Sequence, residues 1–398
     1  MSRVGSRRRV LIVVENLPCP FDRRVWQEAR TLTAAGYVVS IICPKGKGYE
    51  AGYEEIGGIA IYRHGMPMEA EGAFGYLLEY SWALIAEFAL SLRVLFRRGF
   101  DVLHACNPPD TIFLLGRFYK LFGRKFVFDH HDINPELYEA KFNRRDLFYR
   151  LMMALERWTF AAADISIATN ESYRNIAIDR GGMRADRVFV VRSGPDLSRL
   201  RILPPEPALK AGRRYLVGYV GVMGKQEGID LLLESVHHIV RVLKRDDVHF
   251  GLVGGGTELQ ALRDLAQRLG VADYVSFTGR VPDQQLLEML NTADVCVNSD
   301  VANAMNDKST MNKIMEYMAL GKPIVQFDLT EGRVSAQDAS LYAARNDPVD
   351  LATKILSLLD DEALREKMGQ YGRERVTSAL SWDHEAPRLL AAYEALFR

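Results

Sequence analysis

The stretch NDKSTMNKIMEYMALGKPIVQF contains the residues whose types and spacing say most about chemistry. Ser309 or Thr310 can cap the N-terminus of a helix, and Gly321 and Pro323 can end it. Apolar side chains recur between these limits at helical spacing. The sequence therefore predicts a helix over residues 309–320.

Polar side chains on this expected helix are suited to bind a nucleotide diphosphate. Lys308 and Lys313 add positive charge near an N-terminus that the helix dipole already makes attractive to anions. Glu316 lies about one turn deeper, on the same face as Asn312, and its carboxylate can accept hydrogen bonds from both hydroxyls of a ribose. An exposed helix residue would explain Glu316 alone, but the two lysines ahead of it favour a binding function.

Two glycine-rich loops add to this expectation. The segment GYVGVMGKQEGID places glycines between a strand and the next helix, and VGGGTELQ repeats the arrangement one strand later. Glycine lets a diphosphate approach backbone N–H groups and a helix N-terminus closely. Such glycines often serve only the turn, yet two loops of this kind favour nucleotide binding. The candidate donor-binding residues of these loops are Gly221, Gly224, Lys225, Gly254 and Gly256.

The first half of the chain carries a second group of candidates. In KFVFDHHDINPELY, His130, His131 and Asp132 follow an apolar run at its carboxyl end. Adjacent residues point apart, so the pattern is not that of a metal site, and His131 could hydrogen-bond the sugar of a donor. A histidine at the end of a strand is also often structural, and for His104 that explanation is the stronger one.

Asp22, Arg23 and Arg24 open the first expected helix. Two guanidinium groups at this place could bind a phosphate or an acidic acceptor, although a solvated first turn explains them equally well. The preceding turn has no glycine, so the GxGxxG motif of a dinucleotide-binding unit is missing. A dehydrogenase is therefore disfavoured.

Short apolar runs alternate with helical stretches along the chain and must position these side chains. Runs of this kind are strands buried on both faces of a parallel sheet, and ligands of such sheets bind outside the carboxyl ends of the strands. In the first half the runs are RVLIVVE, YVVSIIC, IAIYRH, DVLHAC, KFVFDH, ADISIAT and RVFVVRS. In the second half they are YLVGYVG, VHFGLVG, YVSFTG, ADVCVNS, PIVQFD and SLYAAR.

The order of these runs predicts an α/β protein with two doubly wound, Rossmann-like domains that face a cleft. We expect the first domain over residues 1–200 and the second over residues 213–380. The proline-rich segment PPEPALKAG indicates a linker at 201–212. Apolar residues at helical spacing predict a closing packing helix over 381–398.

Composition narrows the class of protein further. The 398 residues contain 51 Lys and Arg and 51 Asp and Glu, so the basic excess typical of nucleic-acid-binding proteins is missing. Four scattered cysteines form no CxxC pair, which indicates neither a zinc site nor a disulfide framework and suits a reducing compartment. The first apolar run is too short for a signal peptide. We therefore expect a cytoplasmic protein.

Two segments could bind the inner face of the plasma membrane. The apolar stretch 76–96 carries too many charges to span a bilayer, but with Arg93, Arg97 and Arg98 it has the composition of an interfacial helix. The basic, aromatic segment KFNRRDLFYRLMMALERW is the second candidate. A helix packed on the sheet, with its arginines in water, explains the apolar stretch about as well.

Over nearly its full length the chain resembles the retaining family 4 glycosyltransferases of GT-B fold, especially bacterial enzymes of polysaccharide assembly. The resemblance rests on PFDRRVWQEARTLTAAGYVVSIICP, FDHHDINPELY, GVMGKQEGID, FTGRVP and NKIMEYMALGKPIV, of which the last is the most specific. It implies that Glu316 binds the donor ribose, that His131 lies near the transferred sugar, and that Arg280 and Val281 frame the base. It also implies that the closing helix packs back on the first, acceptor-side domain.

By this resemblance the protein moves a sugar, with retention of anomeric configuration, from a nucleotide diphosphate sugar to a glycan or polyprenyl-linked acceptor in cell-surface polysaccharide biosynthesis. A UDP-sugar is favoured as donor, and a GDP-sugar is the alternative. Lysines can neutralise the diphosphate and no DxD cluster is present, so no metal or other cofactor is expected. Two alternatives stay open: a sugar-nucleotide epimerase of GT-B fold, and a non-catalytic protein that binds nucleotide sugars.

Three positions depart from the family's pattern. The arginine and lysine that hold the diphosphate in the family fall at Val222 and Glu227, and the first of the family's two glutamates, spaced eight apart, falls at Lys308. We expect Lys225, Lys308 and Lys313 to supply the phosphate-binding charge instead. If they do not, donor binding is impaired and the non-catalytic alternative gains support.

Overall fold

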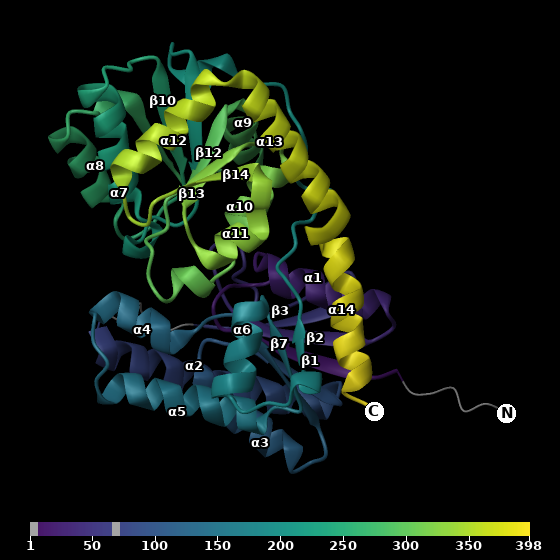
Figure 1. The fold of residues 1–398 in the computed structure, drawn as a ribbon. Coiled ribbons are helices and arrows are strands. Elements are labelled where there is room, and N and C mark those ends of the chain that lie inside the picture. The colour runs from purple at the N-terminus through teal and green to yellow at the C-terminus, as the bar shows by residue number, and fades with distance from the viewer. Residues whose placement is uncertain (1–6, 66–71) are drawn as a thin grey trace. The chain divides into compact units, whose positions relative to one another are not determined.

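The computed structural model describes residues 7–65 and 72–398, and for residues 72–80 it describes the backbone alone. The chain divides into two compact units (Figure 1). Unit 1 comprises Met1–Ser193 together with Glu385–Arg398, and unit 2 comprises Gly194–His384. Each unit contains its own sheet, so the expectation of two α/β, Rossmann-like domains is confirmed.

Unit 1 is built on an eight-stranded sheet in the order β3-β4-β2-β1-β5-β6-β7-β8. Neighbouring strands are parallel except β3 and β4, which form an antiparallel hairpin. The strand order reverses between β1 and β5, so residues that follow these strands lie where a doubly wound sheet binds its ligand. The strands are β1 (Arg9–Val13), β2 (Val38–Pro44), β3 (Tyr53–Ile56), β4 (Ile59–His64), β5 (Val102–Cys106), β6 (Lys125–His130), β7 (Ile165–Ala168) and β8 (Val188–Val190).

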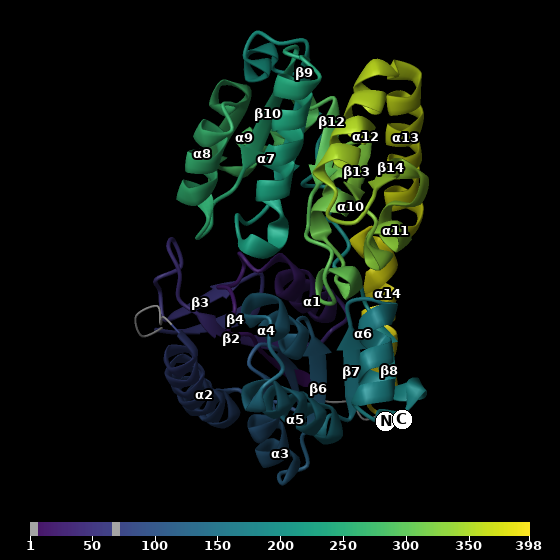
Figure 2. The same ribbon diagram turned by 60° about the vertical axis from the view of Figure 1, so that its left-hand side comes forward.

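The helices of unit 1 include a layer formed by α2, α3 and α5. The Phe88 and Phe118 rings lie 5.0 Å apart between α2 and α3, and the Phe113 and Trp158 rings lie 5.8 Å apart between α3 and α5. Figure 2 shows these three helices beside one another along the lower side of the unit. The helices are α1 (Arg23–Ala34), α2 (Gly72–Arg97), α3 (Phe113–Lys120), α4 (Asn134–Phe142), α5 (Leu147–Ala162), α6 (Glu171–Asn175) and the part of α14 (Trp382–Ala395) that begins at Glu385.

Unit 2 contains a six-stranded, entirely parallel sheet in the order β11-β10-β9-β12-β13-β14. Its order reverses between β9 and β12. The strands are β9 (Tyr215–Val220), β10 (Val248–Val253), β11 (Val275–Gly279), β12 (Val295–Asn298), β13 (Ile324–Phe327) and β14 (Ser340–Ala343). The helices are α7 (Ile229–His237), α8 (Leu259–Arg268), α9 (Asp283–Thr292), α10 (Asn312–Ala319), α11 (Thr330–Ala336), α12 (Pro348–Asp360) and α13 (Glu362–Arg375).

Every apolar run that the sequence assigns to the sheets is a strand, and the structure adds β3. The unit boundaries lie at 193/194 and 384/385. The expected linker, residues 201–212, packs onto α9, because the Leu203 N–H donates to Asn291 Oδ1 (3.1 Å) and the Glu206 N–H donates to Thr292 Oγ1 (2.8 Å). This segment is therefore part of unit 2. The expected closing helix is present as α14.

The apolar stretch 76–96 lies within α2, although the side chains of residues 76–80 are outside the described part of the chain. Among its described side chains, Ala83, Glu87, Ser91 and Val94 are buried. Among the described residues, no helix combines the length and the apolar character that crossing a membrane needs.

Candidate active site

The candidate site residues form two groups, one in each unit, and each group lies at the carboxyl ends of its strands. In unit 2 the main element is α10, which begins at Asn312 with Met311 as its N-cap. The prediction that Ser309 or Thr310 caps this helix is therefore wrong. The chain before α10 forms a short turn instead, and Ser309 Oγ donates to the carbonyl oxygen of Met305 (2.9 Å). The helix ends as expected before Gly321, whose φ is +67°.

Lys313 lies in the first turn of α10, and acidic groups surround its ammonium nitrogen. Nζ lies 2.8 Å from Glu227 Oε2, 3.1 Å from Asp300 Oδ1 and 3.3 Å from the Tyr219 hydroxyl. Burial lowers the pKa of Lys313, but the charge of Asp300 and its other neighbours outweighs burial and raises this pKa well above its usual value. The sequence predicts an open cation, whereas the structure shows one whose charge is already balanced.

Glu227 and Lys313 together explain one departure from the family's pattern. The resemblance implies a lysine where this chain has Glu227, and here Lys313 approaches that position from α10. A Cβ added to Gly221 would lie 3.4 Å from Lys313 Nζ, so the ammonium group also borders the first glycine loop. Burial raises the pKa of Asp300 to about 7, and Lys313 opposes that rise.

Glu316 is the predicted ribose ligand, and the structure pairs it with an arginine that the sequence gave no reason to select. Arg199 Nη2 donates to Glu316 Oε1, and Arg199 Nη1 lies 3.4 Å from Asp283 Oδ2. The side chain of Glu316 is 14% exposed. Tyr317 anchors the same helix, because its hydroxyl accepts the N–H of Val220 at the end of β9 (2.8 Å). The carboxylate is thus held at the sheet's carboxyl edge beside a guanidinium.

The two glycine loops pack against each other. A Cβ on Gly254 would lie 1.8 Å from the Gly221 carbonyl oxygen, and a Cβ on Gly256 would lie 2.3 Å from the Met223 carbonyl oxygen. The N–H groups of Gly221 and Met223 donate to carbonyls of the second loop. These glycines are therefore required by the contact between the loops, and two of the N–H groups expected to meet a phosphate already have partners. Gly224 lies in the same first loop, where an added Cβ would meet only a flexible side chain.

The remaining candidates of unit 2 lie near its surface. Lys225 is exposed in the short turn after β9, and Arg280 is exposed directly after β11. Asn312 is exposed at the start of α10, whereas Val281 and Lys308 are half-buried. Lys225 and Arg280 are thus the exposed cations among the predicted donor ligands.

In unit 1, Arg24 lies in the first turn of α1 with its guanidinium group buried. Nη2 lies 2.8 Å from Asp129 Oδ1 and 3.2 Å from Glu28 Oε1, and Nη1 donates to the Val191 carbonyl (2.8 Å) and to Ser193 Oγ (3.2 Å). In this structure Arg24 thus has neither the open guanidinium that an acidic ligand would meet nor the solvated side chain of the alternative explanation. Its carboxylate partners come from elsewhere on α1 and from β6, and they draw the side chain inward.

Arg23 is exposed beside Arg24, so only this half of the predicted pair presents its side chain on the surface.

His131 follows β6 directly and is bound on two sides. Its Nε2 lies 2.5 Å from Asp129 Oδ2 and 3.0 Å from Arg24 Nε, and its backbone N–H donates to Asn107 Oδ1 (2.8 Å). The side chain is 16% exposed. Burial raises the pKa of Asp129, but Arg24 and His131 outweigh it, and the pKa lies well below its usual value. The histidine is therefore positioned by an ionised carboxylate.

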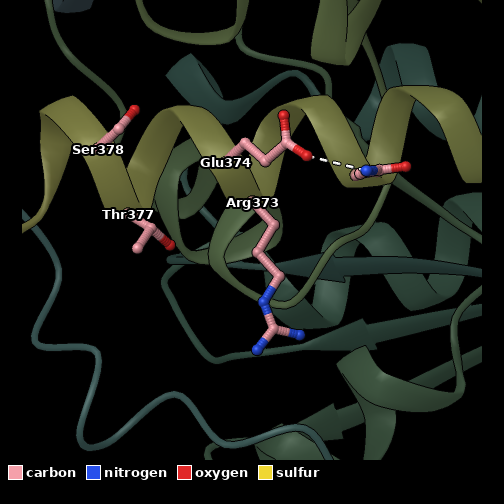
Figure 3. A pocket seen from close by; sticks show the side chains of 5 residues that line it. Arg373, Glu374, Thr377 and Ser378 are labelled. Carbon is pink, nitrogen blue, oxygen red and sulfur yellow. Dashed lines mark hydrogen bonds between the residues drawn. The ribbon is translucent and has the colours of Figure 1, made fainter.

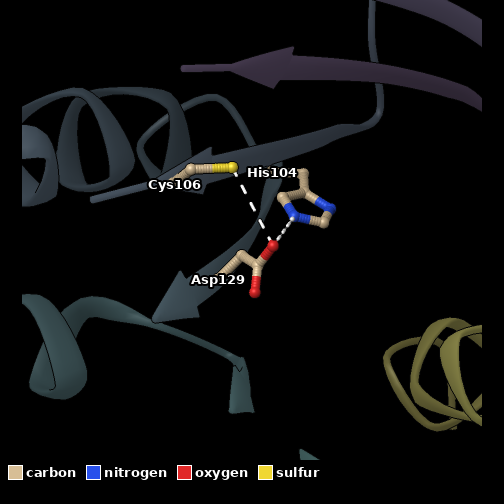
Figure 4. A group of neighbouring side chains, drawn as sticks. All are labelled: His104, Cys106 and Asp129. Carbon is tan, nitrogen blue, oxygen red and sulfur yellow. Dashed lines mark hydrogen bonds and ion pairs between the residues drawn. The ribbon is translucent and has the colours of Figure 1, made fainter. Parts of the chain in front are cut away.

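Figure 4 shows three side chains of types that bind metals, His104, Cys106 and Asp129, converging in the interior of unit 1. Both oxygens of Asp129 already contact Arg24, and burial raises the pKa of the Cys106 thiol well above its usual value. The nitrogen Nδ1 of His104 lies 2.8 Å from the Tyr393 hydroxyl. A neutral thiol and a carboxylate neutralised by arginine are poor metal ligands, so we assign no metal, and His104 is structural as expected.

Figure 3 shows a groove of unit 2 that lies along α13 and the turn after it. Its lining consists of Gln370, Arg373, Glu374, Thr377 and Ser378, and Gln370 Nε2 donates to Glu374 Oε1 (2.8 Å). None of the candidate site residues lines this groove. We assign it no role.

Comparison with known proteins identifies relatives of both units. The family model described as "Glycosyltransferase Family 4" matches residues 22–199, and the model described as "Glycosyl transferases group 1" matches residues 214–361. D-inositol 3-phosphate glycosyltransferase of Thermomonospora curvata is 29% identical over 259 residues, and the match covers 60% of this chain and 58% of that protein. 2-Deoxystreptamine glucosyltransferase of Streptomyces kanamyceticus is 24% identical over 290 residues, 69% of this chain and 72% of that protein.

The match thus spans less than two thirds of the length of the inositol phosphate enzyme.

Solved structures resemble the fold over almost the whole chain. Sucrose-phosphate synthase from Thermosynechococcus elongatus superimposes with a TM-score of 0.79 at 19% identity, covering 98% of this chain and 99% of that one. Anabaena HepE in complex with UDP gives a TM-score of 0.71 at 13% identity, covering 97% and 100%. The two family models together span most of both units, and the chain therefore belongs to the family 4 glycosyltransferases of GT-B fold.

Proposed function

We propose that the protein is a retaining glycosyltransferase that moves a sugar from a nucleotide diphosphate sugar to a glycan or polyprenyl-linked acceptor in cell-surface polysaccharide biosynthesis. One observation carries the proposal: Glu316 and Lys313 project from one helix at the carboxyl edge of the unit 2 sheet, beside two interlocked glycine loops. UDP is favoured as the nucleotide, because similar folds have been solved with UDP or UDP-glucose.

In this proposal Glu316 accepts the ribose hydroxyls, and the diphosphate lies at the N-terminus of α10. The helix dipole, Lys225 and Lys308 supply attraction for the anion, while Lys313 and Glu227 form a fixed pair at its edge. The acceptor oxygen bonds to the anomeric carbon on the face from which the diphosphate leaves, and the hydroxyl proton passes to the departing phosphate oxygen. Groups that stabilise this leaving charge contribute about 3 kcal/mol each when well placed. The proposal includes no metal or cofactor.

The test is a thermal-shift panel with UDP, GDP and ADP on the wild type and on Glu316→Gln. A nucleotide at about 100 times its Kd stabilises the folded protein by about 2.7 kcal/mol, so UDP should raise Tm and the variant should lose most of that shift. Lys367→Ala removes an exposed charge on α13 and serves as the control. A UDP-induced shift that is the same in Glu316→Gln would contradict the proposal.

The two alternatives predict different outcomes in a product analysis. A sugar-nucleotide epimerase would convert UDP-glucose to its epimer without an acceptor. A non-catalytic protein would bind the nucleotide sugar and leave it unchanged. Transfer of the sugar to a membrane extract that contains polyprenyl-linked glycans would exclude both.

We further propose that unit 1 contacts the inner face of the plasma membrane through the layer of α2, α3 and α5. Large apolar side chains of this layer are exposed, and arginines alternate with them at helical spacing. The most exposed are Phe96 (83%), Leu121 (82%) and Leu147 (81%), followed by Ile85, Phe122 and Trp82. The exposed cations of the layer are Arg93, Arg97, Arg117, Lys120, Arg150 and Arg157. Apolar side chains interleaved with arginines match a bilayer interface that carries anionic lipids.

Co-sedimentation with vesicles of phosphatidylglycerol and phosphatidylcholine tests this contact. The wild type should bind at low salt. A variant with Ile85→Ser, Phe96→Ser and Leu121→Ser should bind at least about tenfold more weakly, because each substitution removes apolar surface that the membrane would bury. The control replaces Val242 and Leu243, exposed residues of unit 2, with serine. Absence of wild-type binding to anionic vesicles would overturn the membrane proposal and leave the proposed reaction untouched.

A further inference from the structure

His131 Nε2 has two neighbours that make opposite demands on it. Asp129 Oδ2, 2.5 Å away, can only accept a hydrogen bond when ionised, and Arg24 Nε, 3.0 Å away, can only donate one. Each nitrogen of a neutral imidazole either carries a hydrogen and donates a hydrogen bond, or carries none and accepts a hydrogen bond. The arrangement therefore determines the tautomer of the ring, once the stronger partner is known.

The distances select Asp129 as that partner. A bare Nε2 at 2.5 Å from a carboxylate oxygen would place two lone pairs in contact, whereas an Nε2–H donor makes a short, charge-assisted hydrogen bond. The donors of Arg24 have acceptors other than His131. The Nε–H group also donates to Asp129 Oδ2 (3.2 Å), and Nη2 lies 2.8 Å from Asp129 Oδ1. Arg24 thus holds Asp129 in the ionised form that His131 requires.

Other acidic groups near this pair have pKa values that are shifted in the opposite direction from that of Asp129. Burial raises the pKa of Asp22 and of Asp132, and burial together with the charge of Asp129 raises the pKa of Glu28 well above its usual value. His104 is bound to Tyr393 through Nδ1 and lies 3.4 Å from Asp129 through Nε2. Asp129 differs from these three carboxyl groups, because Arg24 and His131 hold its pKa well below its usual value.

We propose that Asp129, held by Arg24, is a positioning residue that fixes His131 as the Nε2–H tautomer and leaves Nδ1 as the acceptor for a substrate hydroxyl. In the described part of the chain, the side-chain hydrogen bonds of His131 are made through Nε2, and the ring is 16% exposed. The backbone of His131 is fixed independently by Asn107. The final step, the contact of Nδ1 with a sugar hydroxyl, rests on the proposed function.

The tautomer can be measured without a substrate. Two-bond nitrogen-proton correlation spectra of the protein labelled with 15N-histidine distinguish Nε2–H from Nδ1–H, and His131→Asn identifies the signals of this residue. Asp129→Asn removes the ionised acceptor. Glu28→Gln is the matched control, because Glu28 also lies beside Arg24 and is fully buried but does not contact His131.

The wild type and Glu28→Gln should show the Nε2–H tautomer, and Asp129→Asn should show a mixture or the Nδ1–H form. An Nδ1–H tautomer in the wild type would overturn the proposal even if Asp129→Asn failed to fold, and so would an unchanged tautomer in a folded Asp129→Asn.

Turnover of UDP-glucose gives a second measurement. Asp129→Asn should lower kcat by about 100-fold, as for the loss of one transition-state hydrogen bond, with little change in KM. If the tautomer shifts as expected but His131→Asn retains full turnover, the tautomer assignment stands and the role of His131 in the proposed reaction fails.

Discussion

Two sets of buried charged side chains join members from distant parts of the chain. Lys313 on α10 meets Asp300, just after β12, and Glu227, just before α7. Arg24 on α1 meets Asp129 on β6. Burying one charge alone is costly, and a partner at hydrogen-bond distance offsets that cost. Each set therefore depends on all of its members, and removal of one member should leave the others buried without a compensating charge.

Replacing Lys313 with methionine should destabilise the protein by about 3 kcal/mol at pH 8, because Glu227 and Asp300 would remain buried without their cation. The loss should shrink as the pH falls to 5. In the variant, the carboxyl groups of Glu227 and Asp300 would bind protons more tightly in the folded state than in the unfolded state. Protonation at low pH therefore favours folding. Urea unfolding at the two pH values measures the difference. An equal loss at both would show that the carboxylates do not depend on Lys313.

Glu87 gives a second prediction at the scale of a residue. It is fully buried in α2, neither carboxylate oxygen has a hydrogen-bond partner among the described residues, and burial raises its pKa to about 8. As the pH rises from about 4.5 to 8, the unfolded chain loses this proton while the folded protein keeps it, so stability falls. Glu87→Gln removes that dependence. It should stabilise the protein at pH 8 by up to about 4 kcal/mol and change little at pH 5.

Urea unfolding of Glu87→Gln at both pH values tests this prediction. The exposed Glu366 on α13 offers the control, since Glu366→Gln should leave stability unchanged. A gain of equal size at pH 5 and pH 8 would mean that the carboxyl group does not titrate in the expected range.

At the scale of elements, the contact between the two glycine loops fixes the carboxyl edge of the unit 2 sheet. Gly254 has a φ of +139°, and its backbone lies against the Gly221 carbonyl. Gly254→Ala should cost more than about 3 kcal/mol, because both the backbone conformation and the space exclude a Cβ. It should also weaken binding of UDP, since the loop after β9 must move.

Gly224→Ala is the matched substitution in the loop after β9. Gly224 has a negative φ, and an added Cβ there would meet only the end of the Gln226 side chain. Thermal unfolding should show a loss below about 1 kcal/mol. Similar losses in Gly254→Ala and Gly224→Ala would show that the close approach of the loops is not what selects glycine.

The strands could be predicted from the sequence because both faces of a parallel sheet are buried and the runs are apolar throughout. β3 was not predicted, since YEEI alternates exposed and half-buried side chains at the edge of the sheet and, among the described strands, pairs with β4 alone. The start of α10 was misplaced because Ser309 is used by the preceding turn. Local sequence patterns thus predicted the helices and strands, whereas the hydrogen bond of Ser309 in the preceding turn determined where α10 begins.

The candidate site could be predicted only in part. His131 was selected because it follows an apolar run, and it lies directly after β6. Glu316 was selected from its place on the expected helix, and it lies on α10. Whether a cation there is open or paired depends on contacts between residues far apart in sequence. Arg199 and Glu316 are 117 residues apart, and Arg24 and Asp129 are 105 apart. No local pattern contains that information.

At the scale of the molecule, unit 1 is assembled from two separate segments of the chain. Residues 385–398 complete it: Glu385 Oε2 accepts the Arg192 N–H (3.0 Å), and the rings of Tyr37 and Tyr393 lie 5.4 Å apart. The Tyr393 hydroxyl contacts His104, which in turn lies beside Asp129. The C-terminal helix therefore covers the charged cluster that holds His131.

Deleting residues 385–398 should consequently unfold unit 1 and spare unit 2. The deletion uncovers His104 and leaves a buried polar cluster open to water, whereas the sheet of unit 2 receives no strand from the removed segment. Hydrogen exchange should show lost protection in β1, β2 and β5 and retained protection in β9, β10 and β12. Tyr393→Phe, which removes only the hydroxyl, should cost about 1 kcal/mol and keep the protection pattern of the wild type. Equal loss of protection in both sheets after the deletion would mean that the units do not fold independently.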